Sequence, residues 1–279
     1  MGICNKVAGV LAPVILSTVI LSDADMLVTE LQNLGAAVKT ARLDELATRV
    51  ILPYCIMAAV LMGLSLMIYF SPLPEIDSVE SDEIPQDHNT EKTNVLQFPN
   101  LVLGVIALFL YVGAEVLAGD TIGSYGQSQG IALSEAKYFT AFTLTAMVIG
   151  YIIGIFTIPK IISQSKALTI SALTGILFSI IAINTTGYTS VLFIALLGLA
   201  NALVWPAIWP LAIAGLGRFI QTGSALLIMA IAGGALLPLI YGYLADLPEI
   251  GHKAAYWVLV PCYIFILFYS IKGRKMRNW

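Results

Sequence analysis

Charged residues are scarce in this sequence, and so are the residue types that build catalytic and metal sites. Of its 279 residues only 11% are charged, where about 25% is usual for a soluble domain, and 58% are hydrophobic. The net charge of −3 leaves no basic surface to attract nucleic acid. Cys4, Cys55 and Cys262 lie far apart, without zinc-site or disulfide spacing, and are expected to be buried small hydrophobic residues. These shortages exclude a water-soluble globule and predict no nucleic-acid partner and no bound metal.

The sequence also lacks a recognisable catalytic constellation. Its two histidines, His88 and His252, have no nucleophile or set of metal ligands at a working spacing. No phosphate-binding loop is present, which argues against an ATP-driven pump. We therefore predict that the protein is not an enzyme and needs no cofactor.

In place of these features the sequence has long apolar runs without charge. A bilayer core about 30 Å thick takes about 20 helical residues, because every backbone amide must find its partner inside the segment. Runs of this kind predict eight membrane-spanning helices, at about 7–22, 50–70, 98–119, 137–158, 167–184, 191–213, 223–244 and 254–271. The predicted fold class is therefore an all-α integral membrane protein embedded in a lipid bilayer.

Two polar stretches separate some of these spans. Residues 23–49 are charged, with apolar residues at near-helical spacing, and predict an amphipathic helix on the outer membrane surface. A solvated loop is the alternative. Residues 71–97 hold seven of the 17 acidic residues together with three prolines, a composition typical of a disordered linker. This acidic linker divides the spans into two and six.

The orientation follows from the positions of the Lys and Arg residues. If both chain ends face the cytoplasm, as an even number of spans requires, nine of the 14 basic residues lie inside and five outside. The basic tail after Ile271 is the clearest contribution. We predict a multi-pass inner-membrane protein with a cytoplasmic C-terminus and a cytoplasmic linker at 71–97.

The first two predicted spans repeat the pattern of the last two around their prolines. The matching stretches are Gly9-Val-Leu-Ala-Pro13 with Gly234-Ala-Leu-Leu-Pro238, and Val50-Ile-Leu-Pro53 with Val258-Leu-Val-Pro261. Such a repeat is typical of transporters built from two similar halves. It predicts that residues 1–70 are the end of an N-terminal half, that 98–279 are a six-helix C-terminal half, and that four helices belong before residue 1. The alternative is an eight-span protein with a chance repeat.

Three further stretches resemble a known family. They read Phe109-Leu-Tyr-Val-Gly-Ala-Glu-Val116, Asn201-Ala-Leu-Val-Trp-Pro-Ala-Ile-Trp209 and Gly223-Ser-Ala-Leu-Leu-Ile-Met-Ala-Ile-Ala-Gly-Gly234. They are similar to the fucose/galactose/glucose:proton symporter family of the major facilitator superfamily, whose plan is six helices, an acidic linker and six helices. The resemblance implies a monomeric secondary transporter that moves a monosaccharide by alternating access. Its coupling ion would be a proton, with sodium as the alternative.

The resemblance also assigns roles to single residues. Asn5 matches an asparagine at the start of the family's fifth helix that faces the sugar, and Trp205 falls where the tenth helix places an aromatic residue before proline in the cavity. The family's proton-coupling acids lie on its first and fourth helices, which this chain does not contain. Gly150-Tyr151 departs from the Gly-Arg that the family tends to have there, which puts a cytoplasmic gate contact in doubt.

The residues themselves point to a sugar site without the family. Asn201, Trp205 and Trp209 are spaced i, i+4 and i+8, which predicts one helix face. An amide suits the hydroxyls of a pyranose and an aromatic ring suits its C–H faces. Interfacial anchoring or packing against lipid is the alternative for the tryptophans. Pro206 and Pro210 are expected to kink this helix beside protein or a wet cavity.

Glu115 is the only acid well inside a predicted span. A carboxylate there is costly unless it is paired or hydrated, so Glu115 is expected to face the bundle interior and to exchange protons, with Tyr111 one turn earlier as a partner. A protonated structural carboxyl is the alternative. Gln127, in the glycine-rich outer end of the same helix, is placed to reach a sugar hydroxyl or to lie in a solvated loop. Gly233-Gly234 is expected to allow close helix packing.

Two other function classes fit the same observations. A membrane sugar sensor would keep the cavity and lose the transport cycle. An incomplete chain that lacks part of the cavity wall would have no transport activity.

Overall fold

The computed structural model describes residues 2–20, 26, 29–31, 34–71, 93–158, 160–276 and 278, which form helices and turns with no strand among them. The chain separates into two compact units. One comprises Met1–Pro13 with Ile84–Trp279, and the other Val14–Glu83. The predicted all-α class is confirmed for the described residues.

Two helices precede the acidic linker. Helix α1 spans Gly2–Ile20 and helix α3 spans Ala36–Tyr69, and both contain an internal proline. Within α3, Val38–Tyr69 is long and apolar enough to cross a membrane, and none of its apolar window is buried. The described apolar stretch of α1, Cys4–Leu16, is too short to count as a span, so the first of the eight predicted spans falls short among the described residues.

Residues 36–49, part of the predicted amphipathic segment, form the first turns of α3 and run into the second predicted span without a break. Their charges pair locally: Arg42 forms an ion pair with Glu45, and Arg49 Nη2 lies 3.5 Å from Glu45 Oε1. The boundary predicted at residue 50 is therefore a change of polarity within one helix. Residues 23–25, 27, 28, 32 and 33 of the amphipathic segment and residues 72–92 of the linker lie outside the described residues.

Six further spans make up the bundle that follows the linker. Their helices are α4 (Pro99–Asp120), α7 (Phe139–Thr157), α8 (Gln164–Asn184), α9 (Gly187–Asn201) with α10 (Val204–Ile213), α11 (Ile220–Met229) with α12 (Gly233–Asp246), and α14 (Leu259–Ile271). The short helices between them are α5 (Ile122–Ser128), α6 (Leu133–Ala136) and α13 (Gly251–Ala255). With α3, the described residues hold seven helices that are long and apolar enough to cross a membrane.

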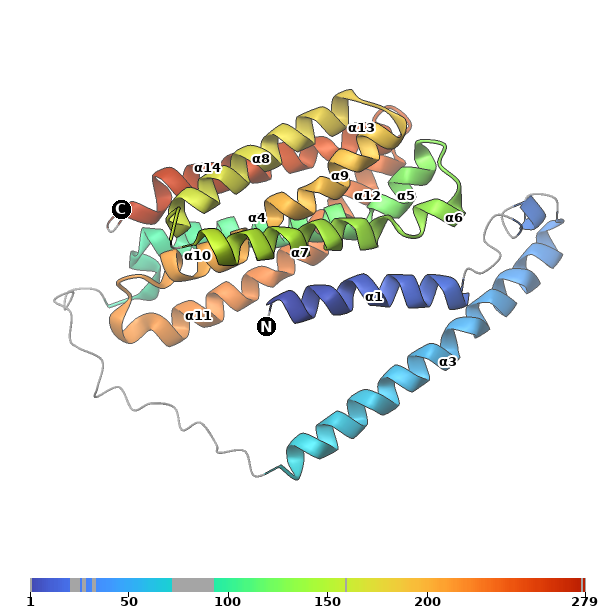
Figure 1. Ribbon diagram of the computed structural model, residues 1–279, viewed down its shortest axis with the longest axis horizontal. Helices are drawn as coiled ribbons and strands as arrows, with labels where there is room; N and C mark the ends of the chain where they lie inside the picture. The colour runs from blue at the N-terminus through green and yellow to red at the C-terminus, as the bar shows by residue number, and fades with distance from the viewer. Residues whose placement is uncertain are drawn as a thin grey trace. The chain divides into compact units, whose positions relative to one another are not determined.

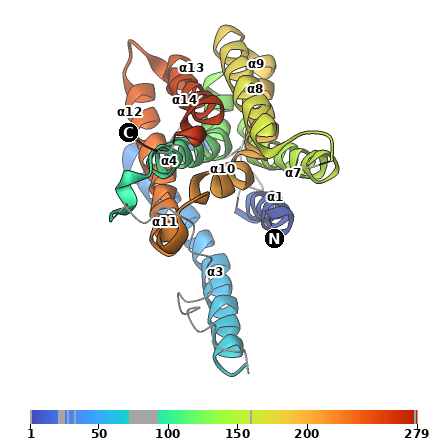
Figure 2. The same ribbon diagram turned by 90° about the vertical axis from the view of Figure 1, so that its left-hand side faces the viewer.

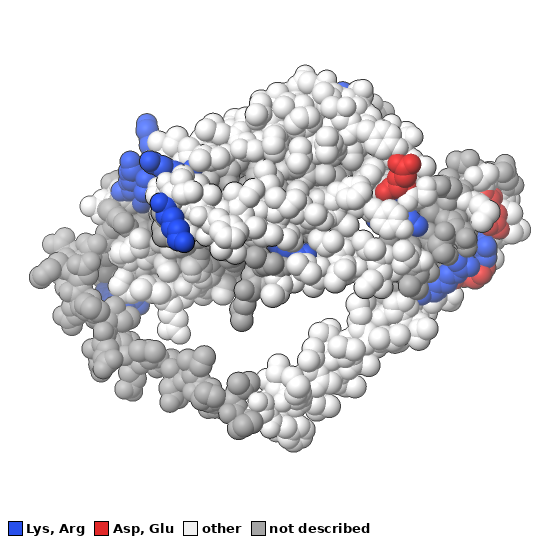
Figure 3. All heavy atoms as spheres, viewed as in Figure 1, with Lys and Arg blue, Asp and Glu red and all other residues white. Residues whose placement is uncertain are grey.

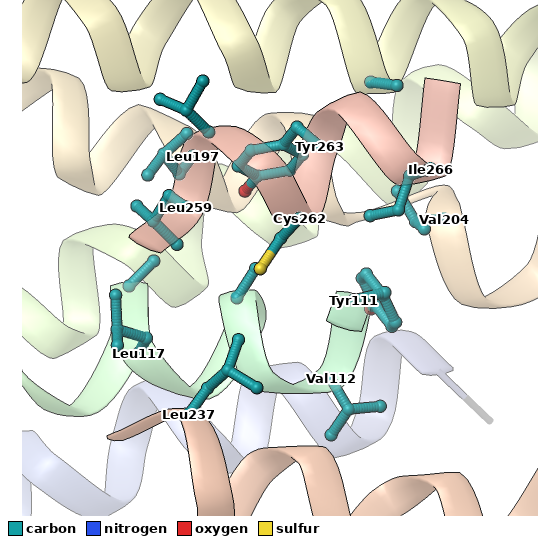
Figure 4. Packing of buried hydrophobic residues seen from close by; sticks show 14 of the residues in the cluster. Tyr111, Val112, Leu117, Leu197, Val204, Leu237, Leu259, Cys262, Tyr263 and Ile266 are labelled. Carbon is teal, nitrogen blue, oxygen red and sulfur yellow. The ribbon is translucent and has the colours of Figure 1, made fainter. Parts of the chain in front are cut away.

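Helix α4 lies in the middle of this bundle (Figure 1, Figure 2). It packs against α7, α9, α10, α12 and α14. The core around it is built from several helices, with Tyr111 and Leu117 of α4 near Leu237 of α12 and Tyr263 of α14 (Figure 4). A side chain on α4 is therefore placed to meet groups from most of the bundle.

Two glycines let helices of the bundle approach closely. A Cβ added to Gly198 would lie 2.0 Å from the carbonyl oxygen of Thr143 in α7, and one on Gly233 would lie 1.9 Å from that of Phe109 in α4. Both neighbours are backbone atoms, so only glycine fits at these crossings. The packing role predicted for Gly233-Gly234 is confirmed.

The cysteines differ from the expectation. Cys262 is buried and its thiol donates to the carbonyl oxygen of Val258 at 3.1 Å, but Cys4 and Cys55 are exposed. Because lipid accepts an apolar side chain as readily as a protein core does, apolar surroundings in the sequence do not predict burial in this class of protein.

The face of the bundle seen in Figure 3 is largely free of charge. On this face Lys and Arg gather at the end of the bundle that carries the C-terminus, and Lys272 and Lys275, close to the C-terminus in the chain, are exposed. An uncharged flank with a basic end is the arrangement expected of a bundle that spans a membrane.

Candidate functional site

The helix predicted to carry Asn201, Trp205 and Trp209 is broken in two. Helix α9 ends at Asn201, residues 202 and 203 form a turn, and α10 begins at Val204. Pro206 explains the break, since it has no N–H and its ring clashes with the carbonyl four residues earlier, that of Ala202. The prediction of one helix face is therefore wrong for Asn201. The predicted kink is present as a break in the helix, one turn before Pro206.

The second proline leaves a carbonyl group free, and a neighbouring helix satisfies it. Pro210 cannot donate to the carbonyl oxygen of Pro206, which instead accepts a hydrogen bond from Gln164 Nε2 of α8 at 3.4 Å. Broken membrane helices depend on such substitutes, because lipid provides no donors. The break is thus held within the bundle.

Aromatic side chains from two helices form a row beside this break. Trp205 and Trp209 of α10 are half-buried and stack with ring centroids 5.8 Å apart and an interplanar angle of 22°. Tyr111 of α4, which is buried, lies 6.5 Å from the Trp205 ring. We call Tyr111, Trp205 and Trp209 the aromatic row. Both tryptophans therefore contact another aromatic ring of the bundle.

Asn201 is buried and has one polar atom without a partner. Its side chain is 1% exposed, and its Oδ1 accepts a hydrogen bond of 2.9 Å from the Tyr263 hydroxyl of α14. Its Nδ2 has no hydrogen-bond partner among the described residues. A buried donor left unpaired costs about 1–3 kcal/mol, so Nδ2 is a candidate to bind a ligand oxygen. Tyr263 belongs to the same buried core cluster as Tyr111 of the aromatic row.

The Tyr263 hydroxyl supports a stability prediction. Replacing Tyr263 with phenylalanine leaves Asn201 Oδ1 buried without a donor, which is expected to cost about 1–3 kcal/mol of folding free energy. Thermal unfolding of the purified protein in detergent measures the loss. Tyr243→Phe is the matched control, because the Tyr243 side chain is 70% exposed. Equal unfolding temperatures for the two variants would contradict the assignment.

Glu115 lies one turn after Tyr111 on α4 and forms an ion pair with Lys6 of α1. The side chains are 18% and 17% exposed, so the pair is mostly withdrawn from solvent. Tyr111 interacts electrostatically with Glu115. The pairing with Lys6 was missed, although the isolated basic residue of one apolar run and the isolated acid of another are a recognisable signal.

Two predicted site residues make no contact with the aromatic row among the interactions of the described residues. Asn5 and Gln127 are exposed, and no hydrogen bond or ring contact found in the described part of the chain joins either of them to the row. In the glycine-rich segment Gln129, rather than Gln127, makes a tertiary contact, since its Oε1 accepts from the Gly187 amide at 3.0 Å. That bond ties the α4–α7 connection to the start of α9.

Gly150-Tyr151, where the sequence departs from the family pattern, contributes to both packing and the site. A Cβ on Gly150 would lie 2.5 Å from the Cβ of Ala202, so this glycine allows α7 to approach the helix break. The next residue, Tyr151, interacts electrostatically with Glu115. The position where the family tends to have arginine is therefore a tyrosine within electrostatic range of the ion pair.

Comparison with known proteins places these features in context, although no family model matches the chain. A glucose/galactose transporter of Brucella abortus is 32% identical over 243 residues, covering 86% of this chain and 57% of the relative. A putative glucose/galactose transporter of Helicobacter pylori is 28% identical over 236 residues, covering 83% and 56%. An L-fucose-proton symporter of Escherichia coli is 24% identical over 198 residues, covering 70% and 45%.

A solved structure has the same fold. The crystal structure of FucP, a major facilitator superfamily transporter in the outward conformation, superposes with a TM-score of 0.67 at 20% identity, covering 98% of this chain and 66% of FucP. The chain thus spans 57% or less of the length of the curated relatives given above.

Proposed function

This chain has the fold of the major facilitator superfamily and is a homologue of bacterial sugar transporters, and on that premise we propose that it carries a monosaccharide across the inner membrane by alternating access. The sugar is a hexose or deoxyhexose of the glucose, galactose or fucose class. The coupling ion is a proton, with sodium as the second candidate, and the protein acts as a monomer.

The observation that carries the proposal is the unpaired Nδ2 of buried Asn201 near the aromatic row. The amide donates to a sugar hydroxyl, and a half-buried Trp205 ring offers its face to the C–H groups of a pyranose. Both groups flank a broken helix, the kind of backbone that transporters use around a midplane substrate site. Polar and aromatic groups so arranged bind a neutral sugar better than an ion.

The basic end of the bundle supports an orientation. Lys272, Arg274 and Lys275 follow directly after α14, and short basic segments next to a span favour the cytoplasmic side. We infer a cytoplasmic C-terminus, with the acidic linker on the same side. Protease accessibility of a C-terminal tag in sealed vesicles of known orientation tests this inference.

Counterflow of labelled sugar tests the function itself. We expect the protein, purified and reconstituted into liposomes preloaded with unlabelled glucose, galactose or fucose, to take up the matching labelled sugar transiently above the level of empty liposomes. Equilibrium binding to the same preparation in detergent is measured in parallel. Binding without counterflow would support a sugar sensor instead, and the absence of both would support a chain that is inactive alone.

A further inference from the structure

Lys6 and Glu115 are an isolated pair of opposite charges. Lys6 is the only charged residue of α1, and the only acids of α4 are Glu115 and Asp120, which is the last residue of the helix. The side chains of Lys6 and Glu115 are 17% and 18% exposed, and both residues belong to the compact unit that contains the six-span bundle. An unpaired charge at membrane depth is costly, so each residue makes the other tolerable.

Packing alone does not explain why this pair is present. Apolar residues of similar volume at two such positions are often as stable as a buried ion pair or more stable, because they avoid the cost of removing two charges from water. Intramembrane ionisable residues are functional candidates for the same reason. The pair is therefore better explained by a functional role of its two charges than by packing.

The groups around Glu115 leave Lys6 as its counter-charge. Glu115 interacts electrostatically with three phenols and one acid, which are Tyr111 and Asp120 of α4, Tyr151 of α7 and Tyr263 of α14. None of these groups is a cation. Within the described residues Lys6 is the one basic group that pairs with Glu115, so it is the counter-charge of this carboxylate.

The pair also adjoins the proposed sugar site. Glu115 follows Tyr111 by four residues on α4, and Tyr111 is part of the aromatic row. Residues spaced by four are neighbours on a helix surface. A change in the charge of Glu115 therefore alters the electrostatic potential at the proposed sugar site.

We propose that Lys6 is the internal counter-ion of Glu115 and that the coupling proton competes with it. A proton from water binds the Glu115 carboxylate, Lys6 keeps its own protons, and the net charge of the pair rises from zero to plus one. The neutral acid no longer holds the ammonium group, so the link between α1 and α4 is released. This inference rests on the proposed function and deepens it by naming the groups that exchange the proton.

The pH dependence of sugar binding tests the proposal. Lys6→Met removes the counter-charge with which the proton competes, so the pH midpoint of binding by the purified protein is expected to differ from that of the wild type. Glu115→Gln and the double variant are expected to lose this midpoint. Lys166→Met, which removes an exposed lysine at the start of α8, is the control and keeps the wild-type midpoint. A Lys6→Met variant with an unchanged midpoint overturns the proposal.

A second measurement separates this inference from the sugar assignment. The unfolding temperature in detergent without sugar is followed over the same pH range, and its pH midpoint in Lys6→Met is again expected to differ from that of the wild type. The exchange Lys6→Glu with Glu115→Lys retains a pair of opposite charges and is expected to unfold closer to the wild-type temperature than either single reversal. If each single reversal is as stable as the exchange, the pair does not interact and the proposal fails, whatever the sugar experiments show.

Discussion

Replacing Trp205 with alanine is expected to abolish detectable sugar binding while leaving the protein folded. Trp205 contacts both Tyr111 and Trp209, so its ring is the centre of the aromatic row. Loss of a central, half-buried aromatic contact typically costs about 2 kcal/mol or more, which is roughly 30-fold in Kd. Equilibrium binding of labelled glucose, galactose and fucose to the purified variant measures the effect.

Trp257→Ala is the matched control for this prediction. Trp257 lies in the short 3-10 helix before α14 and is 51% exposed, away from the aromatic row. We expect its Kd to equal that of the wild type. An unchanged Kd in Trp205→Ala would show that the ring packs the bundle without contacting sugar, and the proposed site would then be wrong.

The second large effect is expected at Gly233, where alanine should destabilise the bundle severely. The added Cβ would lie 1.9 Å from the carbonyl oxygen of Phe109 and 2.7 Å from its carbonyl carbon. These are backbone atoms of central helix α4, so the clash is relieved only by moving α12 away from it. Overpacking of this kind costs about 1–3 kcal/mol or more. The measurement is the thermal unfolding temperature in detergent, together with the yield of monodisperse protein.

Gly242→Ala, in the same helix, is the control. A Cβ at Gly242 meets nothing within 4 Å, so this substitution adds helix propensity without a clash. It is expected to be neutral or to stabilise by up to about 1 kcal/mol. If Gly233→Ala unfolds at the same temperature as Gly242→Ala, the close approach of α12 to α4 is not needed for folding.

Most of the membrane-spanning architecture was predictable from hydropathy. Apolar runs predicted α3 and the six spans of the bundle, because a backbone in lipid must satisfy its hydrogen bonds within each helix. The same rule does not locate helix ends. Residues 36–49 are polar enough to appear separate from the second span, yet they continue α3, since helical hydrogen bonding extends through a charged segment once lipid is left behind.

The candidate site was predictable in part. Trp205 and Trp209 were expected on one helix face and they stack, because a spacing of four residues is local geometry. Asn201 was expected on the same helix, but the clash that Pro206 makes with the preceding turn ends α9 there, and the hydroxyl of Tyr263, on α14, donates a hydrogen bond to its Oδ1. The identity of that partner depends on which helices are neighbours.

The difference between Gln127 and Gln129 has the same cause. Both lie in a glycine-rich segment that the sequence marks as irregular, and nothing local distinguishes them. Gln129 bonds the Gly187 amide, 58 positions away, while Gln127 is exposed. A two-residue difference changes the direction of a side chain around a helical turn, and the position of α9 decides which one finds an acceptor or donor.

Hydrophobic runs and residue spacing thus predicted the class of protein, most of its spans and the shared helix face of Trp205 and Trp209, because each depends on residues close together in the chain. The ion pair of Lys6 with Glu115 depends on the contact between α1 and α4. The hydrogen bond of Asn201 Oδ1, which leaves its Nδ2 without a partner among the described residues, depends on the contact between α9 and α14. Such contacts are set by how whole helices pack, which small residues such as Gly198 and Gly233 permit at specific crossings. Packing therefore determines the charges and donors that the proposed site presents.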